Sequence, residues 1–175
     1  MNKALFLDRD GVINIDHGYV HRKEDVVFIE GIFSLTRAAK EKGYLVIVMT
    51  NQAGIGRGYY TENDFHTLMQ WMQFEFQTRG ARIDAVYHCP FHPVHGIGQY
   101  KRESIFRKPS PGMILKAAHD YEIDVAASIL VGDSPKDIQA GTASGISNLF
   151  FFSKDNSPMP GAQTVADLSE IIAFL

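Results

Sequence analysis

The sequence predicts an α/β fold in which helices cover both faces of a parallel sheet. Two features support this prediction. Short apolar runs alternate with segments whose apolar residues recur at helical spacing, which is typical of parallel sheets. The run from Tyr44 to Met49 is continuously apolar and rich in β-branched residues, as expected for a strand covered on both sides. The predicted sheet is Rossmann-like. The length of 175 residues, 45% of them hydrophobic, suits one domain over residues 1–175 with a substantial core.

The first elements of the chain follow from local patterns. A strand is predicted from Lys3 to Leu7 because this run is apolar and ends abruptly at an acid. A helix is predicted from Ile32 to Lys42, and Gly43 stands where a helix commonly ends. The strand from Tyr44 to Met49 follows directly.

A second helix is predicted to begin at Thr61, since Thr61 and Asp64 have the spacing of a capping box. Gly80 ends this helix, and a third strand is predicted from Ile83 to Tyr87. The apolar residues at helical intervals are Phe65, Leu68, Met69, Met72 and Phe76.

The remaining elements continue the alternation. Ser110 and Pro111 predict the start of a third helix, with serine as its cap and proline at its first position. After it we expect, in order, the strand Ser128–Val131, the helix Pro135–Ser144 ended by Gly145, the strand Asn148–Phe152 and a short terminal helix Asp167–Leu175. Three long loops separate elements, and they are residues 14–30, 51–60 and 89–110.

Polar residues follow the predicted strands at their carboxyl ends, which meet along one rim of a parallel sheet. Asp8 and Asp10 follow the first strand, and because they are two residues apart their side chains can point the same way. Carboxylates at such a rim suit Mg²⁺. One carboxylate can also attack phosphorus, while a second transfers protons. The other polar residues expected at the rim are Thr50, Asn51, Lys108 and Asp133.

Composition excludes several classes of protein. The formal net charge of −3 gives no indication of binding to nucleic acid or to a membrane surface. With Cys89 as the one cysteine, no disulfide within the chain is possible. The sequence shows neither the pattern of a signal peptide nor an apolar run long enough to span a bilayer. We therefore expect a cytoplasmic protein.

Four stretches together resemble the haloacid dehalogenase (HAD) superfamily of phosphatases. They are "FLDRDGVIN", "VMTNQAGIGRG", "RKPSPGMI" and "ILVGDSPKDIQAG". Within the superfamily, "DHGYVHRKEDVVFIEG" and "YHCPFHP" resemble the branch that removes the 7-phosphate from D-glycero-D-manno-heptose 1,7-bisphosphate. The resemblance implies a HAD-like fold and an aspartyl-phosphate intermediate. It also implies a role in nucleotide-activated heptose and lipopolysaccharide biosynthesis.

The resemblance implies a role for each residue at the rim. Asp8 is expected to attack phosphorus, and Asp10 to act first as general acid and then as general base. Thr50 and Asn51 are expected to bind the transferring phosphoryl group, and Lys108 to neutralise its charge. Mg²⁺ is expected to bind to Asp8, the backbone carbonyl of Asp10, and Asp133.

The resemblance also implies a substrate site built from loops, because the chain has no room for a large cap domain. Arg107 is expected to recognise a second phosphate, since an arginine fork suits that group. The other substrate-binding residues expected from the resemblance are Asp16, His17, Tyr19 and Gln52. The expected partner is a small phosphorylated sugar, and the expected state is a monomer.

The third loop departs from the resembling family, which often holds a zinc ion there by the pattern Cys-X-His followed by Cys-X-Cys. Cys89 is present, but Phe91, Ser104 and Phe106 replace the other three ligands. We therefore expect no structural zinc and a small apolar cluster in its place.

Two alternatives remain open at the level of sequence. A histidinol-phosphate phosphatase, or a phosphatase of another small phosphosugar, would carry a similar set of residues. A non-catalytic receiver-like signalling domain would also group acids, a threonine and a lysine on a parallel sheet. Such a domain carries its phosphoacceptor aspartate at the end of the third strand, whereas the predicted strand here ends in "VYHCP".

Overall fold

The computed structural model describes all 175 residues and contains a six-stranded sheet in the order β3-β2-β1-β4-β5-β6. Every neighbouring pair of strands is parallel. The strands are β1 (Lys3–Leu7), β2 (Tyr44–Asn51), β3 (Ala85–Cys89), β4 (Ile129–Gly132), β5 (Asn148–Phe152) and β6 (Gln163–Val165). The predicted α/β fold with a parallel sheet is confirmed.

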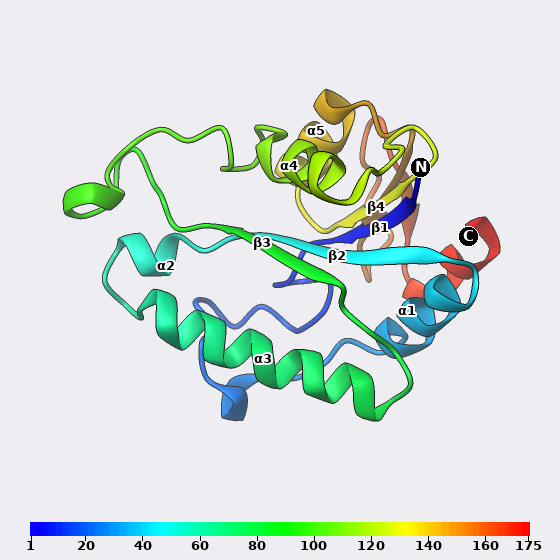
Figure 1. The fold of residues 1–175 in the computed structure, drawn as a ribbon, viewed down its shortest axis with the longest axis horizontal. Coiled ribbons are helices and arrows are strands. Elements are labelled where there is room, and N and C mark those ends of the chain that lie inside the picture. Colours follow the sequence, from blue (N-terminus) through cyan, green and yellow to red (C-terminus); the bar gives the residue numbers. More distant parts are fainter.

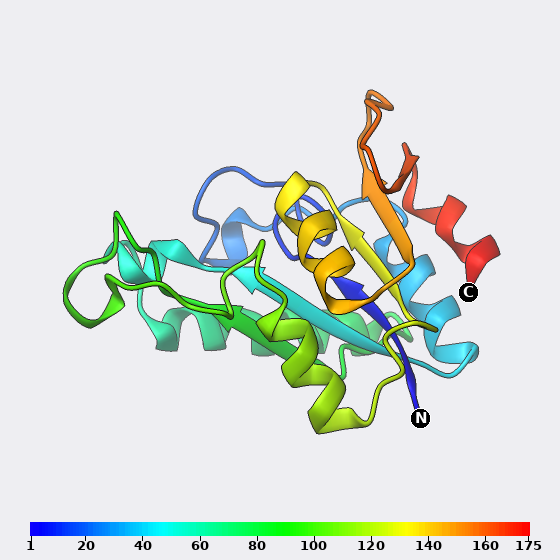
Figure 2. The same cartoon turned by 90° about the horizontal axis from the view of Figure 1, so that it is seen from above.

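Helices cover both faces of this sheet, as Figures 1 and 2 show. One face packs against α1 (Ile32–Glu41), α3 (Glu62–Thr78) and the terminal 3-10 helix η3 (Leu168–Phe174), and the other against α4 (Gly112–Tyr121) and α5 (Pro135–Ser144). Successive residues of β1 alternate between two cores, with Leu5 on the α1 and α3 side and Phe6 on the α4 and α5 side. Burial on both faces explains why the strands are continuously apolar.

The strand order places a topological switch point beside β1. After β1 the chain adds β2 and β3 on one side, and then returns to add β4, β5 and β6 on the other. In open parallel sheets, ligands bind outside the carboxyl ends of the strands at such a point. The ends of β1 and β4 are therefore neighbours, which brings Asp8 close to Asp133.

Short elements lie inside the loops. The helix α2 (Ala53–Gly56) follows β2 directly and leads the chain toward α3. Two 3-10 turns, η1 (Lys23–Asp25) and η2 (Gly98–Tyr100), lie in the first and third loops. No helix of this protein has the length and hydropathy required to span a membrane.

The strands β2, β3 and β6 differ most from the sequence prediction. Strand β3 lies two residues later than predicted, and β2 extends through Thr50 and Asn51, which pair with His88 and Cys89. Strand β6 was not predicted. These differences share one cause: hydrogen bonding to a neighbouring strand, which hydropathy does not record, sets the ends of a strand.

Two helix ends also differ. The helix α4 begins at Gly112 with Pro111 as its cap, because the Ser110 N–H donates to the Arg107 carbonyl in a separate turn. The terminal helix is a 3-10 helix, and the Asp167 carboxylate caps it by accepting from the Ser169 N–H at 2.8 Å. The predicted capping box at Thr61 and the glycine stop at Gly145 are confirmed.

Candidate active site

A cavity of about 670 Å³ opens at the carboxyl ends of β1, β2 and β4. Ten of the eleven residues predicted for the site line it. The exception is His17, which is exposed and lines a neighbouring hollow. The side chains that line the cavity include Asp8, Asp10, Asp16, Tyr19, Thr50, Asn51, Gln52, Tyr60, Arg107, Lys108, Asp133, Ser134 and Lys136.

The centre of the site is an ion-pair network around Lys108, whose side chain is only 4% exposed. Its Nζ lies 2.8 Å from Oδ1 of Asp8 and 2.6 Å from Oδ1 of Asp137, and it also donates to the Met49 carbonyl. Asp137 is fully buried in the first turn of α5. One buried lysine therefore faces two largely buried carboxylates.

Burial and charge act on this network in opposite directions. Burial raises the pKa of Asp8 to about 8, although the ammonium of Lys108 opposes this shift. Burial would lower the pKa of Lys108, but the carboxylates of Asp8 and Asp137 together outweigh it and raise that pKa. Lys108 thus stays a cation, available to an anionic group that enters the cavity.

Asp10 is held by donors from the turn after β1 and from the residue that follows β2. Its Oδ1 accepts from Nη2 of Arg9 at 2.6 Å and from the Asn14 side chain at 3.1 Å. Its Oδ2 accepts from Nε2 of Gln52 at 3.1 Å. Arg9 is fully buried and also donates to the Val20 carbonyl. The fixed orientation of Asp10 therefore depends on a buried arginine and on the fold of the loop.

Gln52 connects Asp10 to the end of β2. Its Nε2 donates to Oγ1 of Thr50 at 2.9 Å, and its Oε1 accepts from the Tyr60 hydroxyl at 2.5 Å. Burial raises the pKa of Tyr60 to about 12, so this phenol stays protonated and keeps donating. Because Gln52 supplies the proton in its bond to Thr50, the threonine hydroxyl is free to donate its own proton into the cavity.

The Asn51 side chain forms two hydrogen bonds to the backbone of the third loop. Its Nδ2 donates to the Lys108 carbonyl at 3.1 Å, and its Oδ1 accepts from the Lys108 N–H at 3.0 Å. Both ends of the amide are therefore used to fix Lys108 beside β2.

Asp133 follows β4 and lies against the turn after β1. Gly11 adopts φ +87°, and a Cβ at that position would come within 1.8 Å of Oδ2 of Asp133. Burial, followed by the charge of Asp137, raises the pKa of Asp133 to about 7. Carboxylate oxygens of Asp8, Asp133 and Asp137 lie within 4.8 Å of one another.

This donor set fits Mg²⁺, which prefers a few carboxylate or carbonyl oxygens and retains several waters. Asp137 is engaged by Lys108 and by the Ser134 hydroxyl and N–H. Asp8 and Asp133 are therefore the carboxylates left for a cation. Burial raises the pKa of both carboxyl groups, so a bound cation would offset the cost of keeping them charged.

The substrate loops form the outer wall of the cavity. Oδ1 of Asp16 accepts from the Gly18 N–H at 2.8 Å, which shapes the turn that presents Tyr19. Arg107 is half-buried, and its Nη1 donates to the Phe91 carbonyl at 3.2 Å. The third loop thus holds this guanidinium at the edge of the cavity.

The third loop is closed by apolar packing around Cys89. Cys89 is buried within the core on the α4 and α5 side, and Phe91 and Phe106 pack against the same core. The Ser104 hydroxyl accepts from the Phe106 N–H at 3.2 Å. Of the four positions where the resembling family often carries zinc ligands, three therefore contribute to one apolar core, and Ser104 to a turn of the backbone. That this loop holds no zinc stays a prediction.

Several residues of the site were not among the predicted site residues, Ser134 and Lys136 on the cavity wall among them. Three of them, Arg9, Tyr60 and Asp137, hold predicted site residues in place by hydrogen bonds. Of these, only Asp137 gave a signal in the sequence, because Ser134 and Asp137 have the spacing of a capping box. That capping box is present. Its second function, the ion pair with Lys108, joins residues 29 apart in the chain and leaves no local pattern.

Comparisons with known proteins agree with this geometry. A family model described as HAD-hydrolase-like matches residues 105–153. D-glycero-alpha-D-manno-heptose-1,7-bisphosphate 7-phosphatase of Burkholderia mallei is 57% identical over 99% of this chain and 94% of its own. D-glycero-beta-D-manno-heptose-1,7-bisphosphate 7-phosphatase of Vibrio cholerae is 52% identical over 82% of this chain and 77% of its own.

A solved structure gives the same result. D,D-heptose 1,7-bisphosphate phosphatase from B. bronchiseptica, complexed with magnesium and phosphate, superimposes with a TM-score of 0.84 and 26% identity. The match covers 98% of this chain and 97% of that one, so neither protein has room for a large cap domain that the other lacks. Because the two relatives share more than half of their aligned residues and span most of the chain, this protein belongs to the heptose-1,7-bisphosphate 7-phosphatases of the HAD superfamily.

Proposed function

We propose that this protein hydrolyses the 7-phosphate of D-glycero-D-manno-heptose 1,7-bisphosphate through an aspartyl-phosphate intermediate. One observation carries the proposal: Asp8 and Asp10 both face one cavity, and the Lys108 ammonium lies 2.8 Å from Asp8. This is the arrangement that transfer of a phosphoryl group to a carboxylate requires.

Asp8 is the nucleophile in this mechanism. Its carboxylate oxygen forms a bond to phosphorus while the bond from phosphorus to the sugar oxygen breaks. The Asp8 Oδ1 accepts from the Arg9 N–H at 2.7 Å and pairs with Lys108, which fixes the plane of the carboxyl group. A fixed nucleophile lowers the entropic cost of in-line attack.

Asp10 moves the proton in both halves of the reaction. It protonates the departing sugar oxygen, and afterwards takes a proton from the water that attacks the aspartyl-phosphate. Oδ1 of Asp10 accepts from Arg9 and Asn14, whereas Oδ2 accepts from Gln52 alone. The Oδ2 atom is therefore the proton carrier.

Thr50 and Lys108 stabilise the transferring phosphoryl group. The Thr50 hydroxyl donates to one of its oxygens, since Gln52 already supplies the proton in the other bond of Thr50. Lys108 offsets the charge on the oxygens. Asn51 acts through the backbone of Lys108, so we assign it a positioning role instead of the phosphoryl contact expected from the sequence.

The residues that would hold Mg²⁺ are Asp8, Asp133 and the backbone carbonyl of Asp10. When bound, the ion reduces the repulsion between the nucleophile and the anionic substrate. The protein itself supplies the rest of the arrangement. The absence of a side chain at Gly11 leaves space for the Asp133 carboxylate, and the Lys108 ammonium compensates the negative charge of Asp137.

The substrate is a phosphosugar with a second anionic group. We assign recognition of the second anionic group to Arg107. Asp16, Tyr19 and Gln52 on the cavity wall are assigned to the rest of the substrate. Without a large cap domain the cavity stays open, so a sugar can extend outward with its second phosphate toward the third loop. We assign no contact to His17, which lies outside this cavity.

The test is a comparison of kcat/KM for the α and β anomers of the heptose bisphosphate, for histidinol phosphate and for a small aromatic monophosphate. We expect a heptose bisphosphate to exceed histidinol phosphate by about 100-fold or more, equivalent to about 2.7 kcal/mol of transition-state stabilisation. Both anomers are included because one of the two relatives above is named for the alpha anomer and the other for the beta anomer. Preference for histidinol phosphate would overturn the assignment.

A further inference from the structure

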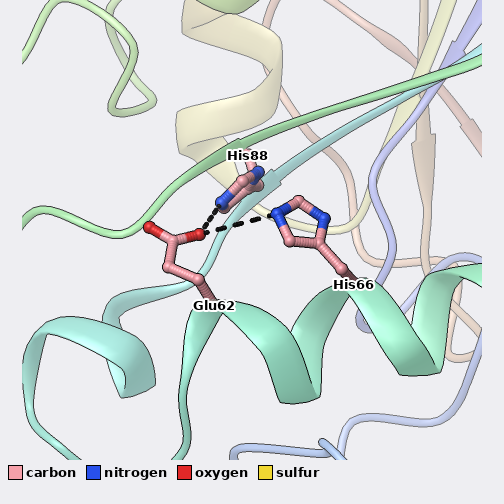
Figure 3. A group of neighbouring side chains, drawn as sticks. All are labelled: Glu62, His66 and His88. Atoms are coloured by element: carbon pink, nitrogen blue, oxygen red, sulfur yellow. Dashed lines mark hydrogen bonds and ion pairs between the residues drawn. The ribbon is translucent and has the colours of Figure 1, made fainter.

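A group of metal-binding side chains lies outside the catalytic cavity, where α3 begins beside the edge strand β3. Figure 3 shows Glu62, His66 and His88 pointing toward one another. Glu62 and His66 are four residues apart and share one face of α3, while His88 reaches across from β3. None of the three lines the catalytic cavity.

The distances suit a single ion after small movements. Nε2 of His88 lies 2.5 Å from Oε2 of Glu62, and Nε2 of His66 lies 4.0 Å from the same oxygen. All three ligand atoms lie within 4.8 Å of one another. Tetrahedral zinc, with bonds of about 2.0–2.1 Å, separates its ligand atoms by about 3.3 Å, so shifts of about 1.5 Å or less complete the site.

One ligand is held in place and one can adjust. The His88 ring packs against Phe65 with the ring centroids 4.4 Å apart, and its side chain is 18% exposed. The His66 side chain is 59% exposed, so it has more room than His88 to change rotamer. A hollow of about 240 Å³ borders both histidines, and the Glu62 side chain is 37% exposed, so water can reach the site to complete the coordination.

The donor types indicate which metal would bind. Two imidazoles and one carboxylate suit zinc and its neighbours in the transition series, whereas Mg²⁺ and Ca²⁺ favour oxygen ligands throughout. We propose that Glu62, His66 and His88 bind one zinc-class divalent ion, separate from the Mg²⁺ site, which fastens the start of α3 to β3. The strand β3 has a neighbour in the sheet on one side only, so a clip to α3 on one face of the sheet adds a second attachment for this edge strand.

This site differs from the zinc loop of the resembling family. His88 and Cys89 are adjacent in β3 and point to opposite faces, since Cys89 packs in the core on the α4 and α5 side. The sequence-based expectation of no structural zinc considered only the third loop, where Phe91, Ser104 and Phe106 replace three of the four ligands. It did not consider His88 together with α3, which only the folded chain brings near.

Calorimetric titration of the full-length protein with zinc chloride tests the proposal, with excess Mg²⁺ present to occupy the catalytic carboxylates. We expect one equivalent of zinc to bind with a dissociation constant in the micromolar range. His66→Asn should weaken binding by about tenfold to a hundredfold or more, since even the loss of a partner that only supports a ligand has that effect. His66 is exposed, so this variant should fold normally.

Two further variants serve as matched controls. His92→Asn removes an imidazole from the third loop, and Cys89→Ser removes the one thiol. Both should bind zinc as the wild type does, and zinc should raise the Tm of both but not of His66→Asn. A third variant, His88→Asn, removes the other imidazole of the site. The proposal would be overturned if His66→Asn and His88→Asn both bound zinc as the wild type does, or if the wild type bound zinc only at millimolar concentration. Loss of binding in Cys89→Ser would also overturn it.

Discussion

Asp10 shows how single atoms divide the chemistry of this site. Its two oxygens are chemically alike in a free carboxylate, yet Arg9 and Asn14 hold Oδ1 while Oδ2 accepts from Gln52 alone. Arg9 lies between the two acids in the sequence and is fully buried. Its cost of burial is offset by the bonds that it makes to Asp10 and to the Val20 carbonyl.

The first prediction concerns the nucleophile. Asp8→Asn should reduce turnover below about a tenth of the wild-type rate, because the amide cannot form the phosphorus–oxygen bond. The fold should persist, since asparagine has the shape of aspartate. Phosphate release and circular dichroism measure the two effects. Asp155→Asn, at an exposed acid far along the chain, is the control and should leave turnover unchanged.

The second prediction concerns Asp10. Asp10→Asn should reduce kcat by about 10²–10⁴-fold, the usual contribution of a general acid–base group. Substrates with good leaving groups need little help from an acid in the first step, so burst kinetics with such a substrate should show the aspartyl-phosphate accumulating. Absence of a burst together with slow turnover would show that Asp10 serves the attack by Asp8.

The third prediction concerns Arg107. Arg107→Ala should reduce kcat/KM for the heptose bisphosphate by about tenfold to a hundredfold more than for a small monophosphate, because a charge-assisted arginine bond is lost only for the former. Lys101→Ala is the matched control, since Lys101 lies in the same loop but is exposed and does not line the cavity. Equal losses on both substrates would assign Arg107 to the fold or to the reacting phosphoryl group.

At the scale of elements, the turn after β1 and the end of β4 are in close contact. Gly11 has a positive φ, and any side chain there would overlap the Asp133 carboxylate. The third loop is tied to β2 by the paired bonds between Asn51 and Lys108. The site therefore depends on contacts between the ends of elements as well as on the catalytic side chains.

The fourth prediction tests the contact between Gly11 and Asp133. Gly11→Ala should abolish phosphatase activity and weaken Mg²⁺ binding measured by calorimetry, because the new methyl group displaces Asp133. Gly43→Ala is the matched control: Gly43 also has a positive φ, of 79°, but a Cβ there meets nothing within 4 Å. The control should lose about 1–2 kcal/mol of stability and keep its activity.

At the scale of the whole molecule, the strand order collects residues from distant segments at one rim. The chain leaves β1 in one direction and returns in the other, so Asp8, Lys108 and Asp133 surround one cavity although they span most of the sequence. The same arrangement buries charge, and Mg²⁺ together with Lys108 is expected to compensate it.

The fifth prediction concerns this compensation. Removal of Mg²⁺ with EDTA should stop phosphate release, and added Mg²⁺ should restore it. Saturating Mg²⁺ should also raise the Tm, because a ligand that binds only the folded state stabilises it. The Asp133→Asn variant should show a much smaller Tm increase with Mg²⁺. Full activity in a thoroughly metal-depleted buffer would refute the role of the metal.

The sequence by itself determined the parallel sheet and brought most of the residues of the candidate site to one rim of it. Strand runs such as Tyr44–Met49 are recognisable because burial on both faces demands continuous apolar residues. Polar residues directly after such runs, such as Asp8 and Asp133, could be placed together because parallel strands end at one rim.

The tertiary structure decided what local patterns cannot encode. The ion pair of Lys108 with Asp137, the support of Gln52 by Tyr60 and the meeting of His88 with Glu62 join separate elements. Their distances follow from how helices pack on the sheet, and packing depends on the whole core at once. Sequence spacing therefore placed Asp8 and Asp10 beside each other, whereas only the folded chain set the charge, orientation and protonation of the groups around them.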